Sequence, residues 1–282
     1  MSDAPRVWLI TSCSSGIGRE IALAALAAGD RVAVTARNPE SVADLVASAP
    51  SSAFGVALDV TDSAQIRAAV TATEARFGRI DVLVNNAGYG YVSSVEEGED
   101  AEVRRMFETN FFGAIELIKA VLPGMRARRD GYLVNMSSTT GFVSMPGNVY
   151  YSTSKFALES LSEGLAKELA PFGIRVTVVG AGTFRTDWSG RSMRETRTPI
   201  DDYASSVGER RELIRSMDGR QPGDPAKLGE VVVDLAELED PPPRLVLGRD
   251  AYEAYRGKLR ELDAMLTEWE STILATDFDE AS

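Results

Sequence analysis

The chain of 282 residues contains no histidine and only one cysteine, Cys13. The absence of histidine excludes every nucleophilic system built on a Ser-His or Cys-His pair, and it removes the commonest protein ligand of metal ions. A single cysteine excludes an internal disulfide and a cysteine metal cluster, so we interpret Cys13 as a free and inert thiol. Hydrolases and zinc enzymes are therefore disfavoured, and no metal site is expected.

Long apolar runs and an excess of positive charge are also missing. No run approaches the ~20 apolar residues that a membrane helix needs, and strand-like residues begin at Val7 without a signal-peptide pattern. The net charge of −12 would repel nucleic acid and anionic membranes. We expect a soluble, cytoplasmic protein that binds a small molecule rather than nucleic acid or a membrane.

What the sequence does contain is a regular alternation of strand-like and helical segments. This alternation predicts one α/β domain over residues 1–282 with a mostly parallel sheet. The expected strands are residues 6–11, 31–36, 53–58, 80–84, 131–136, 174–179 and 245–247. The expected helices are residues 19–28, 39–49, 62–77, 100–128, 149–172, 225–238 and 251–274, the fourth of them breaking near Pro123.

Two segments of the C-terminal half stand apart from this alternation. The polar stretch 183–223 is long for a connection, which predicts a substrate-binding loop or lid. The C-terminal helical extension, residues 249–275, carries a stripe of apolar residues that we expect to pack on the body or on another subunit. These residues are Tyr252, Tyr255, Leu259, Leu262, Leu266, Trp269 and Ile273.

A tyrosine and a lysine four residues apart, Tyr151 and Lys155, share one face of an expected helix. An ammonium beside a phenol favours the phenolate and brings its pKa from about 10 towards working pH, where general acid–base catalysis is most efficient. Ser138 ends the strand that precedes this helix. The same spacing arises by chance in many helices, so its interpretation depends on the neighbouring motifs.

A turn of small residues, 12–18, joins the first strand to the first helix. Dinucleotides bind beyond the carboxyl ends of parallel strands, with the pyrophosphate against backbone N–H groups and the positive end of a helix. Gly16 and Gly18 would let backbone and ligand approach closely. The spacing differs from Gly-x-Gly-x-x-Gly, and ordinary turn glycines are the alternative.

Together these motifs resemble the classical short-chain dehydrogenase/reductase family, in a branch similar to 17β-hydroxysteroid and retinol dehydrogenases. The resemblance is strong over roughly residues 6–190 and rests on Thr11-Ser-Cys-Ser-Ser-Gly-Ile-Gly18, Asp59, Asn85-Asn-Ala-Gly88, Asn110, Ser138 and Tyr151-Ser-Thr-Ser-Lys155. It implies a Rossmann-type doubly wound parallel sheet of about seven strands with helices on both faces. It also implies an NAD(P)-dependent oxidoreductase that interconverts a ketone or aldehyde with an alcohol.

The resemblance assigns four catalytic residues. Tyr151 would give or take the hydroxyl proton, and Lys155 would hold the ribose and lower the pKa of Tyr151, helped by the charge of the oxidised nicotinamide. Ser138 would hydrogen-bond the carbonyl or alkoxide oxygen. Asn110 would help to hold a water for proton relay, or would be only a polar residue that bends the helix.

The resemblance also implies a set of cofactor contacts. Asp59 would accept a hydrogen bond from the adenine amino group, although an acid at a helix N-terminus is the alternative, and a structural role competes for Asn86. Thr186 matches the threonine that contacts the nicotinamide amide. The expected contacts are Thr11, Ser12, Ser14, Ser15, Gly16, Ile17, Gly18, Arg37, Asp59, Val60, Asn86, Ala87, Gly88, Tyr151, Lys155, Gly182, Thr183 and Thr186.

The end of the second strand indicates which cofactor is used. Thr35-Ala36-Arg37 has no carboxylate to bind a ribose 2′-hydroxyl, and the guanidinium of Arg37 suits a 2′-phosphate. We therefore predict NADP(H) in preference to NAD(H). The alternative is that Arg37 is a solvated surface residue.

Two positions depart from the family pattern. Ser12 stands where the family has glycine, and a serine in a left-handed turn costs on the order of 1 kcal/mol. Either the turn does not need that geometry or cofactor binding is weakened. Ala181-Gly182 replaces the family's Pro-Gly after the sixth strand, which would leave the following loop freer.

The intact set of catalytic residues favours an enzyme over a non-catalytic NADP(H)-binding sensor or scaffold, which is the alternative function. The substrate would be a small carbonyl or alcohol compound in an apolar pocket, although loop aromatics are also ordinary packing residues. The pocket candidates are Phe142, Val143, Met145, Phe184, Trp188 and Met193. The resemblance suggests a homodimer or homotetramer through the helices of Asn110 and Tyr151, and an interaction module built on the C-terminal helix is a weaker idea.

Overall fold

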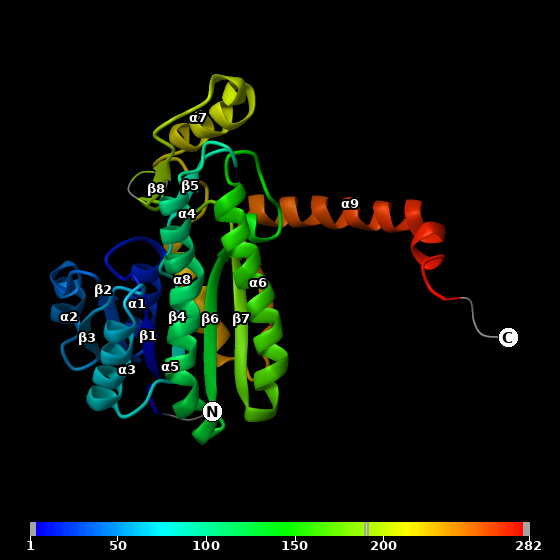
Figure 1. The fold of residues 1–282 in the computed structure, drawn as a ribbon. Helices are drawn as coiled ribbons and strands as arrows, with labels where there is room; N and C mark the ends of the chain where they lie inside the picture. The colour runs from blue at the N-terminus through cyan, green and yellow to red at the C-terminus, as the bar shows by residue number, and fades with distance from the viewer. Residues whose placement is uncertain (1–3, 189, 191, 279–282) are drawn as a thin grey trace.

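The computed structural model describes residues 4–188, 190 and 192–278. At its centre lies a seven-stranded sheet in the order β3-β2-β1-β4-β6-β7-β9, and all neighbouring strands are parallel (Figure 1). This confirms the predicted doubly wound parallel sheet. The strands are β1 Val7–Ile10, β2 Arg31–Ala36, β3 Ala53–Ala57, β4 Val82–Asn85, β6 Gly131–Ser138, β7 Ile174–Ala181 and β9 Arg244–Leu247.

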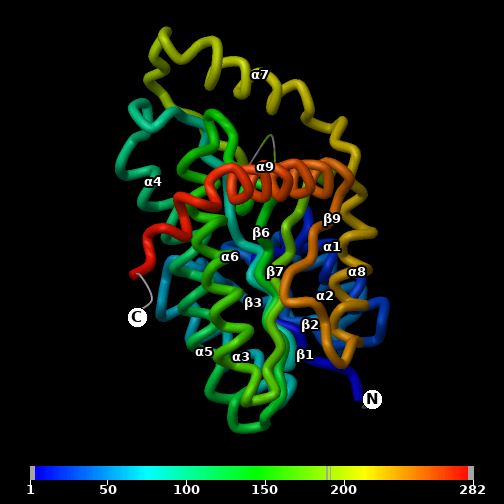
Figure 2. The backbone as a smooth tube through the Cα atoms, turned by 90° about the vertical axis from the view of Figure 1, so that its right-hand side faces the viewer, coloured from blue at the N-terminus to red at the C-terminus, as the bar shows by residue number. Residues whose placement is uncertain are grey.

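Helices cover both faces of the sheet, as Figures 1 and 2 show. One face packs against α1 Gly16–Ala27, α2 Ala43–Ser48 and α8 Pro225–Glu237, and the other against α3 Ser63–Phe77, α5 Gly113–Arg128 and α6 Val149–Leu169. Side chains alternate between the faces of a strand, so Trp8 and Ile10 join the first core and Leu9 joins the second. Apolar residues on both faces explain why the strands read as nearly continuous apolar runs.

The strand order reverses between β1 and β4, because β2 and β3 lie on one side of β1 whereas β6, β7 and β9 lie beyond β4. In open parallel sheets the crevice at such a switch point, beyond the carboxyl ends of the strands, is where ligands bind. The fold therefore brings the turn after β1, the loop after β4 and the end of β6 to one place.

The expected break of the long helix near Pro123 is wrong. Pro123 lies inside α5, and the helix continues to Arg128. Pro123 is exposed, so the carbonyl that loses its helical partner can bind solvent, and the buried Val121 and Met125 hold the helix on the sheet. The irregularity lies earlier, in a π-helical turn, Glu108–Phe112, between α4 Asp100–Phe107 and α5.

The segment 183–223 contains regular structure that the sequence analysis did not predict. Strand β8, Met193–Glu195, pairs in parallel with β5, Gly90–Val92, and α7, Glu209–Ser216, follows. Together they lie above the carboxyl ends of the large sheet, at the top of Figure 1. We call β5 and residues 183–223 the cap.

The C-terminal helix α9, Arg249–Leu274, contacts the body only through its first turns. Tyr255 is buried and stacks on Phe142 with 4.5 Å between ring centroids. Residues 259–278 are exposed throughout, and the helix projects from the body in Figure 1. Packing on the body is therefore confirmed only for the start of the helix. None of the helices in the described ranges is long and apolar enough to cross a membrane.

Candidate active site

A cavity of about 380 Å³ lies at the carboxyl ends of β1, β4, β6 and β7. Its walls come from the turn after β1, the loop after β4, the end of β6, the first turn of α6 and the cap. Of the expected site residues, those that line it are Ser12, Ser15, Gly16, Ile17, Asn86, Gly88, Ser138, Tyr151, Gly182, Thr183 and Thr186.

Ser12 adopts a left-handed conformation, with φ at 62°. Of the two alternatives that the sequence left open, the first is therefore excluded: this turn does need the geometry that favours glycine. A serine held there costs on the order of 1 kcal/mol. Gly16, with φ at 63°, takes the same conformation without that cost.

Thr11 and Asn86 fasten the turn after β1 to the loop after β4. The hydroxyl of Thr11 accepts hydrogen bonds from the backbone N–H groups of Asn86 and Ala87, both at 2.8 Å. The side-chain amide of Asn86 donates to the Thr11 carbonyl at 3.0 Å. A Cβ at Gly18 would lie 2.4 Å from that amide nitrogen, so only glycine fits there. Asn86 thus has a structural role in addition to its place in the cavity wall.

The first turn of α1 lies at the wall of the cavity with its backbone N–H groups. Ser15 is the N-cap residue, but its side chain makes no capping hydrogen bond, and the first turn contains no acidic residue. The N–H groups at a helix start have no partner within the helix and carry partial positive charge. Because Ser15, Gly16 and Ile17 line the cavity, this end of α1 suits an anionic ligand.

Tyr151 is buried on α6, and its phenol lies beside the side chain of Ser138 at the end of β6. The ring of Trp188 lies 5.4 Å from its ring, centroid to centroid, with the planes tilted by 52°. Burial raises the pKa of Tyr151 to about 12, and the neighbouring Ser138 side chain opposes this only in part. Lys155 is not among the causes of this shift, and the expected lowering of the pKa by Lys155, helped by the charge of the oxidised nicotinamide, stays a prediction. At neutral pH the phenol keeps its proton.

Lys155 lies on the same face of α6, as its spacing from Tyr151 predicted. Its ammonium nitrogen is buried, lies 5.9 Å from the Tyr151 ring centroid and donates a hydrogen bond to the Met136 carbonyl at 2.8 Å. Burial lowers the pKa of Lys155 to about 8, opposed by the negative charge of Glu159 one turn further along. Lys155 is therefore fixed between β6 and α6 and titrates near neutral pH.

Asn110 is buried in the π-helical turn, and its amide connects three parts of the site. Its oxygen accepts from the Tyr89 N–H at 3.0 Å, and its nitrogen donates to the Tyr89 carbonyl at 2.9 Å and to the Ser154 hydroxyl at 3.2 Å. The side chain is thus fully used within the protein. The distortion of the helix agrees with the alternative role of Asn110 as a residue that bends the helix.

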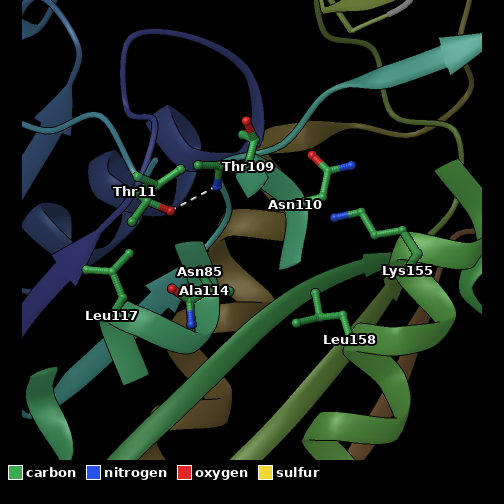
Figure 3. A pocket seen from close by; sticks show the side chains of 10 residues that line it. Thr11, Asn85, Thr109, Asn110, Ala114, Leu117, Lys155 and Leu158 are labelled. Atoms are coloured by element: carbon green, nitrogen blue, oxygen red, sulfur yellow. Dashed lines mark hydrogen bonds between the residues drawn. The ribbon is translucent and has the colours of Figure 1, made fainter. Parts of the chain in front are cut away.

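A second, much smaller cavity of about 10 Å³ lies between Asn110 and Lys155 (Figure 3). In this view the ammonium of Lys155 points towards the Asn110 amide. Asn85 also lines the cavity, and its buried Oδ1 has no hydrogen-bond partner among the described residues. Polar walls and this volume suit about one water molecule.

At the outer edge of the sheet, Arg37 is exposed and forms no ion pair with any described residue. Asp59 lies after β3, and its Oδ1 accepts from the N–H of Thr61 at 2.9 Å and from its hydroxyl at 2.7 Å. The N-cap of α3 is Asp62, which accepts from the N–H groups of the first turn. The N-cap is thus Asp62 and not Asp59, and both roles expected for Asp59, the adenine contact and the acid near a helix N-terminus, stay predictions. Val60 is buried beside it.

The loop after β7 is fixed by a residue that the sequence analysis missed. The N–H and the hydroxyl of Thr183 both donate to Asp250 Oδ2, at 2.7 and 2.6 Å. A Cβ at Gly182 would lie 2.2 Å from Asp250 Oδ1, so this contact requires glycine. Asp250 belongs to the first turn of α9, and it holds the loop that the missing proline was expected to leave freer. Thr186 follows and accepts from the Trp188 N–H at 3.3 Å.

The apolar part of the cavity differs from the expected one. Met145, Phe184 and Trp188 line it, whereas Phe142, Val143 and Met193 do not. Phe142 stacks on Tyr255 instead, and Met193 packs inside the cap. The wall that was missed comes from α7, with Arg210, Ile214 and Met217. Their spacing of four and three residues was a helical signal in the sequence.

Comparison with known proteins agrees with this architecture. Residues 6–197 match the family model described as short chain dehydrogenase. The chain is 40% identical over 273 residues to oxidoreductase BOA17 of Botryotinia fuckeliana, which covers 96% of this chain and 99% of the relative. It is 36% identical over 263 residues to retinol dehydrogenase 8 of Bos taurus, covering 86% of this chain and 82% of the relative.

Two solved structures extend the comparison. A short-chain dehydrogenase from Streptomyces avermitilis superposes with a TM-score of 0.91 at 46% identity, covering 98% of this chain and 100% of that one. A gluconate 5-dehydrogenase from Burkholderia cenocepacia in complex with NADP and tartrate gives a TM-score of 0.73 at 27% identity, covering 88% and 95%. The chain belongs to the classical short-chain dehydrogenase/reductase family, on its retinol dehydrogenase-like branch, and is an NAD(P)-dependent oxidoreductase.

Proposed function

We propose that the protein transfers a hydride between NADP(H) and a ketone, aldehyde or secondary alcohol, with Tyr151 as the general acid–base. The observation that carries the proposal is that Tyr151 and Ser138 lie together at the wall of the large cavity, with Lys155 buried behind them. The alternative, a non-catalytic NADP(H) sensor or scaffold, has no need for these three side chains together.

The residues present fit a nicotinamide dinucleotide. Its pyrophosphate would bind at the uncapped start of α1 beside Ser12 and Gly16, and its ribose would bind Lys155. Asn86, Gly88, Thr183 and the neighbouring wall residues would hold the rest of the molecule. When bound, the cofactor supplies or accepts the hydride.

The protein's own residues would handle the proton. The Ser138 hydroxyl would donate to the substrate oxygen and hold it beside Tyr151, whose phenol is protonated at neutral pH and can give its proton to that oxygen. Lys155 borders the small cavity next to Asn110, and a water there would return a proton along this path. Since the Asn110 side chain is already used, its main-chain carbonyl would hold that water.

Arg37 supports the preference for NADP(H). An exposed guanidinium at the end of β2, without an ion pair among the described residues, is free to bind a 2′-phosphate. The NADP complex of the gluconate 5-dehydrogenase adds to this support. Asp59 would accept from the adenine amino group through its second oxygen, beside Val60.

The cap would form the substrate lid, and its apolar wall would bind an apolar part of the substrate. Association into a homodimer or homotetramer would use the helices around Asn110 and Tyr151, where Phe112 and Phe156 are 46% and 42% exposed. The cytoplasmic location stays a prediction from the sequence.

The experiment that tests this function is a screen of ketones and secondary alcohols with both cofactors, read by nicotinamide absorbance, in the wild type and in Tyr151→Phe. The variant should lose turnover by about three orders of magnitude or more while it binds the cofactor normally, because only the proton donor is removed. Full activity of Tyr151→Phe would refute the mechanism. Cofactor binding by the wild type without any turnover would favour the sensor.

A further inference from the structure

Helix α7 of the cap carries three arginines with different surroundings. Arg211 lies 3.6 Å from Glu195 and 3.8 Å from Glu97, and Arg215 donates to Glu195 at 2.9 Å. Arg210 forms no ion pair or hydrogen bond with any described residue, and its Nε is buried without a partner. One of the three cations is therefore not neutralised by the protein.

The aliphatic part of the Arg210 side chain lies near apolar groups. A Cβ at Gly147 would lie 3.3 Å from Val92, 3.3 Å from Val207 and 3.6 Å from Arg210 Cγ, which places these groups against the loop before α6. Burial without a compensating charge lowers the pKa of Arg210. Partly buried cations without a counter-charge raise the free energy of the fold, so such residues commonly serve a ligand.

Arg210 also lines the large cavity, together with Tyr151, Met145, Asn148 and Ile214. Arg210 lines the cavity on the side of the cap and the start of α6, whereas the turn of residues 12–18 lines it at the end of β1. Two carboxylates, those of Asp187 and Asp250, also line the cavity, and the carboxylate of Asp250 accepts hydrogen bonds from Thr183. Arg210 thus lines the same cavity as the proposed proton donor.

We propose that the substrate is a carbonyl compound with an apolar body and a carboxylate, and that Arg210 binds this carboxylate. This rests on the proposed function, because it names the substrate class of the same cavity. The planar guanidinium can donate two parallel hydrogen bonds to a carboxylate. The apolar wall of Met145, Trp188 and Ile214 would cover the body between the carboxylate and the carbonyl.

Calorimetric binding to the protein saturated with oxidised cofactor tests this site without turnover. The probes are three keto acids, each paired with its methyl ester: levulinate, para-acetylbenzoate and a long-chain oxo fatty acid. In the wild type at least one acid should bind about tenfold tighter than its ester. Arg210→Met should abolish this preference, and Arg210→Lys should keep part of it. Arg215→Met, a change to a paired arginine of the same helix, should leave it intact.

Several outcomes would overturn the proposal: no acid preference in any pair, a preference that survives in Arg210→Met, or a loss of cofactor affinity in Arg210→Met with the preference unchanged. The last result would assign Arg210 to the cofactor phosphates. Failure of the proposed function gives a different result, in which acids bind through Arg210 but no ketone is reduced.

A second inference concerns α9 and rests on separate observations. Its apolar residues alternate at spacings of three and four, which is the a and d pattern of a coiled coil. From Leu259 onwards this seam has no partner among the described residues, and its side chains are between 37% and 53% exposed. The exposed seam residues are Leu259, Leu262, Leu266, Trp269 and Ile273. Such a row is normally covered by another helix.

The two halves of α9 carry opposite net charges. Residues 249–260 contain four basic and two acidic residues, whereas residues 261–274 contain four acidic residues and no basic one. Two copies side by side in the same direction would place like charges together. In the opposite direction, the basic half of each helix meets the acidic half of the other. An antiparallel pair also closes as a two-fold dimer.

We propose that the exposed seam of α9 binds α9 of a second copy, antiparallel. Arg256, Asp263 and Glu270 lie seven residues apart along one flank of the seam. In an antiparallel pair this flank of one helix faces the same flank of the other. Arg256 therefore pairs with Glu270 of the second copy, and the two copies of Asp263 face each other. The narrow seam and the acidic second half fit this occupant better than an anionic membrane surface.

Light scattering after size exclusion, at several concentrations of the full chain, tests the pairing. Leu259→Glu with Leu266→Glu should halve the mass of the wild-type assembly, whereas Leu213→Glu, a similar change on α7, should not alter it. Arg256→Glu and Glu270→Arg should each weaken assembly, the double exchange should restore it, and Asp263→Asn should strengthen it. Equal masses of the wild type and the Leu259/Leu266 variant, or no recovery in the double exchange, would rule the pairing out.

Discussion

The floor and the cap of the large cavity are built in different ways. On the floor, β6 and β7 pair over eight residues, and Lys155 and Asn110 are fixed by hydrogen bonds to main-chain groups. In the cap, β5 and β8 pair over only three residues, and Arg210 has no partner among the described residues. We infer from this difference that the floor keeps the proposed catalytic side chains in a fixed arrangement, while the cap selects the substrate.

The strongest test of this division compares Ser138→Ala with Ile214→Ala. Removing the Ser138 hydroxyl takes away a polar group beside Tyr151 and the proposed donor to the substrate oxygen, so kcat should fall about 100-fold or more. Ile214 is a cap residue that lines the cavity, and its truncation should raise KM while kcat changes only a few-fold. Steady-state kinetics with the best ketone from the screen measures both. An equal loss of kcat in the two variants would break the comparison.

Arg37→Asp should change the Michaelis constants of the two cofactors by different amounts. The loss of a charge-assisted contact to the 2′-phosphate, with repulsion added, should raise KM for NADPH about tenfold to 100-fold and leave KM for NADH nearly unchanged. Arg31→Asp is the matched control, because Arg31 is exposed at the opposite end of the same strand. If Arg37→Asp shifts both Michaelis constants equally, Arg37 does not select the cofactor.

The buried lysine predicts a pH dependence. With its pKa lowered to about 8, Lys155 carries its positive charge below that pH and loses it as the pH rises. Cofactor affinity should therefore fall by up to about tenfold as the pH increases through about 8, because a charged donor to the ribose is lost. Binding titrations across this range measure the effect. Lys155→Arg, which stays charged, should bind with little pH dependence; a curve identical to that of the wild type would assign the titration to another group.

The smallest expected effect concerns the left-handed Ser12 in the turn after β1. Ser12→Gly removes the conformational cost of a left-handed serine, about 1 kcal/mol. Glycine also raises the entropy of the unfolded chain, which offsets part of this gain in stability. The net gain of about 0.5 kcal/mol should raise Tm by roughly 1–2 °C in thermal unfolding. The same change at Ser14, which is not left-handed, should lower Tm slightly. A lower Tm for Ser12→Gly would show that the serine side chain contributes contacts that outweigh its conformation.

Much of the floor could be predicted from the sequence because its signals are local. The strands are apolar runs, and Tyr151 and Lys155 meet on α6 because a helix brings residues four apart together. The cap depends on distant partners: β5 and β8 are three residues each and pair across 100 residues of sequence. The missing partner of Arg210 is a property of the folded molecule, which no spacing reveals. The same holds for Asp250, whose contact with Thr183 joins residues that lie 67 positions apart in the sequence.

Helix α9 also sets a practical limit on how the chain can be shortened. Its first turns belong to the body, since Asp250 holds the loop of Thr183 and Tyr255 packs on Phe142. A stop codon placed before Arg249 to remove the exposed helix would also release the loop of Thr183 at the wall of the large cavity. A shortened protein intended for crystallisation has to keep Tyr255 and end beyond it.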